Sequence, residues 1–104
     1  MLDIYLVSIQ LCRDVRGIGE QVARFDRNLL HQLRRAVTSV PLNLAESDGV
    51  SGGNRRQRRL TALGSAREVG ACLDVAEALG YASVDVGVRR RLDHVIGVLV
   101  KLTR

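Results

Sequence analysis

The segment from Gln32 to Glu46 constrains the fold of this chain most, because it combines a helical repeat with an internal proline. Apolar residues in it and just before it recur every three or four positions, which places them on one face of a helix. These residues are Leu30, Leu33, Val37, Val40 and Leu44. Pro41 removes one backbone hydrogen bond and costs a helix interior about 3 kcal/mol. The repeat therefore predicts a helix over residues 27–48 whose packing offsets this cost.

Three further segments carry the same periodicity and predict helices over residues 2–24, 54–79 and 84–103. We expect Ser83 to be the N-cap of the last helix, and residues 49–53 to form a flexible, exposed linker. Because the connections are short, neighbouring helices should run antiparallel. Of the 104 residues, 46% are apolar but only 3% aromatic, which suits one core of aliphatic side chains. The sequence thus predicts a single all-α domain over residues 1–104, an antiparallel up-down four-helix bundle.

The predicted helix over residues 54–79 is apolar on more than one side. One stripe consists of Ala62, Ala66, Val69, Leu73 and Ala76. Much of the opposite side is also apolar, at Leu60, Leu63, Ala71 and Ala78. A helix of this kind needs more cover than one bundle face provides. It either lies centrally in the fold or also contacts a neighbouring subunit, so we expect a homo-oligomer.

Positive charge dominates the chain, which carries a net charge of +5, with Lys101 the single lysine among 16 basic residues. Four of the arginines form the densest cluster, directly after the glycine-rich linker: Arg55, Arg56, Arg58 and Arg59. They are candidates for binding nucleic-acid phosphates, because a guanidinium matches phosphate geometry and a helix start offers free backbone N–H groups. The alternative is a solvated turn whose arginines reflect genome composition.

Arg34 and Arg35 lie within the proline-containing segment. We predict that they take part in a structural ion pair with Glu46 or Glu68, since carboxylates near an apolar face need a cationic partner or hydrogen bonds. Contact of Arg34 and Arg35 with nucleic acid is the alternative.

No residue pattern indicates catalysis. The histidines, His31 and His94, have no acid, base or metal partner in sequence, and the glycines form no phosphate-binding loop. Cys12 and Cys72 lie among apolar positions and should be reduced and buried. The start of the chain lacks the features of a signal peptide, and no apolar run is long enough to span a membrane. We therefore expect a cytoplasmic, non-enzymatic protein without cofactor or metal.

Four stretches resemble a known family in order and spacing: Gln32–Ala36, Ser39–Glu46, Leu63–Glu68 and Leu79–Tyr81. The family consists of small four-helix-bundle proteins associated with intervening sequences in bacterial 23S ribosomal RNA genes. The resemblance implies a left-handed up-down bundle that assembles into a homopentamer, without enzyme activity. Four matching positions belong to its structural motif: Pro41, Asn43, Glu46 and Glu68. The chain departs from the family pattern at Ser47, where glycine is usual.

A related branch of this family is the accessory protein of diversity-generating retroelements, which binds nucleic acid and a reverse transcriptase. Two hypotheses follow from the residues and the resemblance. The first is an oligomeric protein whose basic surface binds RNA, DNA or a nucleic-acid-processing partner such as a reverse transcriptase. The second is a structural or protein-interaction module whose positive charge is incidental.

Overall fold

Four α-helices make up most of residues 3–104, the part of the chain that the computed structural model describes. They are α1 (Asp3–Ala23), α2 (Arg27–Asp48), α3 (Gly52–Ala78) and α4 (Val86–Leu102). No strand occurs between residues 3 and 104, so the all-α prediction is confirmed. The predicted start of the first helix, at residue 2, lies outside the described residues.

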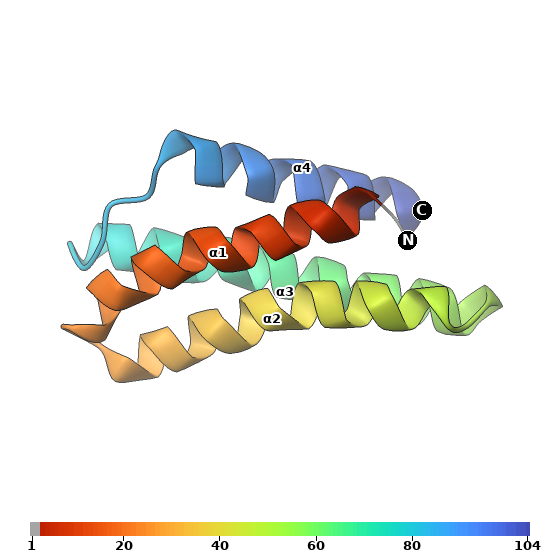
Figure 1. Ribbon diagram of the computed structural model, residues 1–104, viewed down its shortest axis with the longest axis horizontal. Coiled ribbons are helices and arrows are strands. Elements are labelled where there is room, and N and C mark those ends of the chain that lie inside the picture. Colours follow the sequence, from red (N-terminus) through yellow and green to blue (C-terminus); the bar gives the residue numbers. More distant parts are fainter. Residues whose placement is uncertain (1–2) are drawn as a thin grey trace.

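The helices lie side by side in a bundle about 42 Å long. Helix α1 packs against α2 and α4, and α3 packs against the same two helices. The start of α1, the α2–α3 connection and the end of α4 lie at one end of the bundle (Figure 1). The other two connections lie at the opposite end.

The core consists of aliphatic side chains from all four helices. Five leucines are completely or almost completely buried: Leu11, Leu33, Leu44, Leu73 and Leu99. Every member of the apolar repeat predicted for α2 is buried, from Leu30 to Leu44. Packing between α1 and α2 is close at Gly19, where a β-carbon would lie 2.9 Å from Leu30 Cδ1. Burial of this face explains why the helix persists through Pro41.

Two aspartate side chains mark the starts of α2 and α4 by accepting hydrogen bonds from backbone N–H groups. Asp26 caps α2, because its side chain accepts a hydrogen bond from Leu29 N–H at 2.9 Å. The predicted N-cap of the last helix, Ser83, is wrong. Asp85 caps α4 by accepting from Gly87 N–H at 2.9 Å. The Ser83 N–H instead donates to Gln21 Oε1 of α1, so the chain remains irregular for two more residues.

Helix α3 also differs from its predicted range. It begins at Gly52, two residues earlier than expected, so the connection from α2 contains only residues 49–51. Gly52 has a φ of +60°, which glycine adopts at little cost. At the other end, Gly80 has a φ of +73° and Tyr81 N–H donates to Ala76 O at 2.8 Å. This is the glycine-terminated helix ending that the Leu79–Tyr81 motif encodes.

Candidate nucleic-acid interface

Pro41 and Cys12 form a structural pair across α1 and α2. Within a helix, Val37 O would accept a hydrogen bond from the N–H four residues later, but Pro41 has none. The Cys12 thiol of α1 donates to Val37 O instead, at 3.6 Å. Pro41 itself is buried. The proline of the family motif is therefore accommodated by packing and by a thiol from the neighbouring helix.

Asn43 of the motif links α2 to α3 through two serines. Its side-chain amide donates to Ser39 O at 2.8 Å and to Ser39 Oγ at 3.0 Å. Ser65 Oγ of α3 then donates to Ser39 Oγ at 2.7 Å. This half-buried network fixes the register of α2 against α3, because each polar atom has a specific partner.

Glu46 forms an ion pair with Arg58 of α3 at 3.0 Å. The predicted pairing of Arg34 or Arg35 with Glu46 or Glu68 is therefore wrong, since residues 3–104 contain no such pair. Arg35 lies three helical turns before Glu46, beyond the reach of its side chain. Glu68 is exposed. An exposed ion pair such as Arg58–Glu46 contributes about 0–1 kcal/mol.

Two members of the predicted arginine cluster bind backbone carbonyls. Arg55 Nε donates to Ser47 O at 3.2 Å and to Val50 O at 3.0 Å. Arg56 donates from Nε and Nη2 to Thr103 O, at 3.1 and 2.8 Å. Both arginines thereby satisfy carbonyl groups at helix C-termini, which lack partners within their own helices. A carbonyl is neutral, so each guanidinium keeps its full positive charge.

The other two cluster members are in different surroundings. Arg58 is compensated by Glu46. Arg59 is half-buried, and its Nε is buried without a hydrogen-bond partner among the described residues. The structure therefore does not bring four free guanidiniums together: two are anchored, one is ion-paired and one is partly buried.

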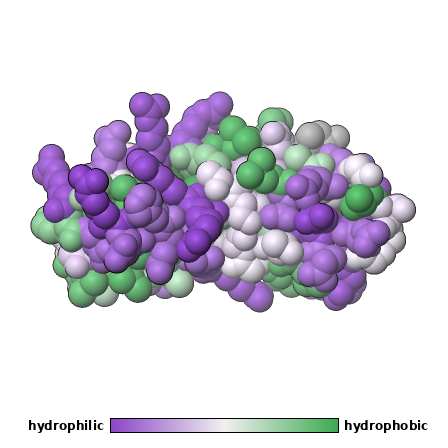
Figure 2. Space-filling model, turned by 90° about the horizontal axis from the view of Figure 1, so that it is seen from below, coloured by the Kyte–Doolittle hydropathy of each residue, from purple (hydrophilic) through white to green (hydrophobic). Residues whose placement is uncertain are grey.

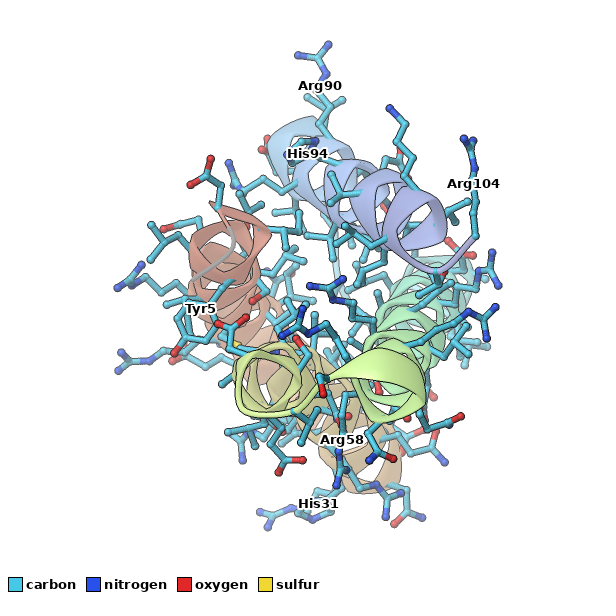
Figure 3. The ribbon with its side chains drawn as sticks, turned by 90° about the vertical axis from the view of Figure 1, so that its right-hand side faces the viewer. Tyr5, His31, Arg58, Arg90, His94 and Arg104 are labelled. Carbon is cyan, nitrogen blue, oxygen red and sulfur yellow. The ribbon has the colours of Figure 1, made fainter. Side chains whose placement is uncertain are left out.

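The arginine cluster lies at the same end of the bundle as the end of α4. We define the basic end as six cationic residues: Arg55, Arg56, Arg58, Arg59, Lys101 and Arg104. The carboxylates at this end are fewer, namely Asp3, Glu46 and Asp48. Figure 3 looks onto this end and shows Arg104 and Arg58 extending outward on different sides. Sequence reasoning missed Lys101 and Arg104, although antiparallel packing would have placed them beside the start of α3.

Arg34 lines a hollow between α1 and α2 with a volume of about 260 Å³. Its lining consists of Cys12, Val15, Arg16, Arg34, Val37 and Thr38. Neither Arg16 nor Arg34 forms an ion pair with any residue between 3 and 104. Arg35 is exposed on α2 and does not line this hollow. Arg34 and Arg35 are therefore adjacent in sequence, but only Arg34 lines the hollow.

The three arginines of α4 are in two kinds of surroundings. Arg89 pairs with Asp74 and Glu77 of α3, and Arg91 pairs with Asp14 of α1 at 2.6 Å. The hydrogen bonds that Arg91 donates to Asp14 raise the pKa of Arg91. Arg90 extends away from the bundle (Figure 3). It also lines a wide groove of about 620 Å³ between α1 and α4. Two of the three therefore hold α4 against its neighbours.

Cys12 and Cys72 are both free cysteines, of which Cys12 is half-buried and Cys72 is buried. Burial raises the pKa of the thiols of both Cys12 and Cys72, so they remain protonated at neutral pH. Residues 3–104 contain no group of three histidine, cysteine or acidic side chains that could hold a metal ion. Over the same range, no helix is both long and apolar enough to cross a membrane.

Four packed helices with a cationic end define a small all-α four-helix-bundle protein. The chain belongs to the 23S rRNA-intervening sequence protein family, whose model matches residues 1–100. No curated protein matches the chain.

Proposed function

We propose that this protein is a non-enzymatic, self-assembling bundle that binds RNA or DNA through its basic end. The observation that carries the proposal is the excess of six cationic side chains over three carboxylates at one end of the molecule. A surface of this kind attracts the phosphate backbone irrespective of base sequence.

Anchoring by carbonyls prepares Arg55 and Arg56 for this role. A guanidinium has five N–H donors. Arg55 uses only its Nε hydrogen, and Arg56 uses Nε and Nη2, so each retains donors for an external phosphate. Because these side chains are already held in place, binding loses less side-chain entropy than it would with free arginines.

Salt dependence of binding tests the proposal. Each neutralised phosphate of a single strand releases counterions, so affinity falls with a slope of about 0.7 in log–log form. Three phosphate contacts would lower the affinity by roughly 20-fold between about 50 and 200 mM salt. Fluorescence anisotropy with a labelled oligonucleotide measures this slope. An affinity that does not change with salt would refute phosphate recognition.

A second candidate function is a structural or protein-interaction module, and a specific surface favours it. The outer side of α3 exposes apolar residues toward its C-terminal half: Ala71, Val75, Ala78 and Leu79. Val75 is 45% exposed and Leu79 is 57% exposed. In this candidate function, a second copy of the chain or a nucleic-acid-processing protein such as a reverse transcriptase would cover these four residues, which we call the exposed stripe. Binding of such a protein without any affinity for nucleic acid would favour this candidate.

Self-assembly is part of both candidates. The exposed stripe on α3 supports it, because contiguous apolar side chains on a surface indicate an interaction site. We include in the proposal an antiparallel, up-down and left-handed arrangement of the helices, and the homopentamer that the family resemblance suggests. The short connections and the positions of the helix ends in Figure 1 support the up-down order.

A further inference from the structure

The hollow between α1 and α2 combines an apolar floor with two cationic walls. Val15 and Val37 are only 2% and 3% exposed and form its floor together with Cys12. Arg16 of α1 and Arg34 of α2 are exposed and line the same hollow. No carboxylate lines it. Two positive groups therefore share one concavity without an internal counter-charge.

Five other arginines of the bundle, in contrast, have partners within the fold. Arg58, Arg89 and Arg91 form ion pairs, and Arg55 and Arg56 bind carbonyls. Within residues 3–104, neither Arg16 nor Arg34 donates a side-chain hydrogen bond. Thr38 offers no donor to a ligand in this state, because its hydroxyl hydrogen bonds to Arg34 O at 2.9 Å. The guanidiniums are the polar groups that remain free to bind.

The shape and chemistry of the hollow match one nucleotide. A volume of about 260 Å³ accommodates a planar base on the valine floor. Guanidinium groups stack on base faces and also pair with phosphate oxygens. A base inside a duplex is stacked and paired, so it cannot enter a depression between two helices. Figure 2, seen from the α2 side, shows hydrophilic side chains gathered over the half of this face nearer the α1–α2 connection.

We infer that this hollow binds a single unpaired nucleotide, with its base on Val15 and Val37 and its phosphate held by Arg16 and Arg34. The inference rests on the proposed function and adds that the protein prefers single-stranded nucleic acid to a duplex. It also assigns phosphate binding to Arg16, which lies outside the basic end.

Glutamine substitutions test the hollow. The variant Arg16→Gln/Arg34→Gln removes both cationic walls, while neither side chain has an internal partner whose loss would unfold the bundle. The matched control, Arg67→Gln/Arg90→Gln, makes the same charge change on α3 and α4. We expect the first variant to weaken binding of a single-stranded oligonucleotide by on the order of tenfold, as the loss of charge-assisted hydrogen bonds to one phosphate implies. The control should change it less than threefold, and the preference for single strands over duplex should disappear only in the first variant.

The possible results distinguish failure of the nucleotide site from failure of phosphate binding at the basic end. Equal losses in the two variants, or equal affinity of the native protein for single strand and duplex, would overturn the nucleotide site but leave phosphate binding at the basic end standing. An absence of binding to any nucleic acid would overturn both. Preference for an acidic peptide over the oligonucleotide would assign the hollow to a protein ligand and also overturn the inference.

Cys12 provides a second readout that does not depend on affinity. Its thiol lines the hollow, whereas Cys72 is 5% exposed and lies in the core. Saturating oligonucleotide should slow alkylation of Cys12 at least fivefold, because a bound base covers the thiol. Unchanged alkylation of Cys12 under conditions where the oligonucleotide binds would place the nucleotide elsewhere.

Discussion

At the residue scale, Pro41 leaves the Val37 carbonyl without its partner in the helix, and the Cys12 thiol of α1 takes that place at 3.6 Å. The helical repeat around Pro41 is readable from spacing alone, and it correctly predicts a continuous helix through the proline. The partner of the orphaned Val37 carbonyl, Cys12, lies 25 residues earlier in the chain. Only the packing of α1 on α2 brings the two together, so no local pattern could indicate the contact.

The contact predicts that Cys12 and Pro41 are energetically coupled. Cys12→Ala should cost more stability in the native chain than in a Pro41→Ala background, where residue 41 again donates to Val37 O. The coupling should be about 0.5 kcal/mol, at the low end for a hydrogen bond because a thiol is a weak donor. Urea unfolding of the four proteins in this double-mutant cycle measures it.

Cys72→Ala is the matched control for this cycle. Cys72 lies in the core and forms no hydrogen bond with Val37, so its cost should be the same in both backgrounds. If Cys12→Ala also costs the same with and without Pro41, the thiol contributes packing alone.

At the element scale, apolar periodicity predicted the existence of four helices, and tertiary contacts decided their limits. The repeat in α2 and the glycine ending of α3 follow from local chemistry. The start of α4 does not, because Ser83 and Asp85 are both suitable caps by residue type. The structure selects Asp85, since Ser83 and Val84 donate their N–H groups to side chains of α1 and α3.

Helix α3 exposes apolar residues whose role in self-assembly can be tested. The sequence left open whether the additional apolar residues of this helix are covered inside the fold or by a neighbouring subunit. In the structure Leu63 is buried within the bundle, whereas Val75 and Leu79 are exposed. We expect Val75→Ser/Leu79→Ser to shift the protein toward monomers in light scattering at micromolar concentration. The helical content should not fall, because neither residue belongs to the core.

The control for this surface is Leu42→Ser. Leu42 is 64% exposed on α2, outside the stripe, and its replacement should leave the assembly unchanged. A native protein that is monomeric at micromolar concentration would contradict self-assembly altogether.

At the scale of the whole molecule, the sequence reveals the amount of positive charge but not its placement. The Arg55–Arg59 cluster was visible as a run, but its division into anchored, paired and half-buried members depends on carbonyls and on Glu46. Arg16 and Arg34 are 18 positions apart. Their shared hollow arises from the α1–α2 contact, and nothing in their sequence neighbourhoods indicates it.

The most direct test of the account is to remove charge from one end of the bundle at a time. Lys101→Gln/Arg104→Gln lowers the charge of the basic end by two, and Arg24→Gln/Arg27→Gln makes the same change near the opposite end. The affinity for a single-stranded oligonucleotide at low salt should fall on the order of tenfold for the first variant, with a salt slope smaller by about 1.4. The second variant should lose less than threefold. Equal losses for the two variants would mean that net charge alone matters, and would contradict a binding surface at the basic end.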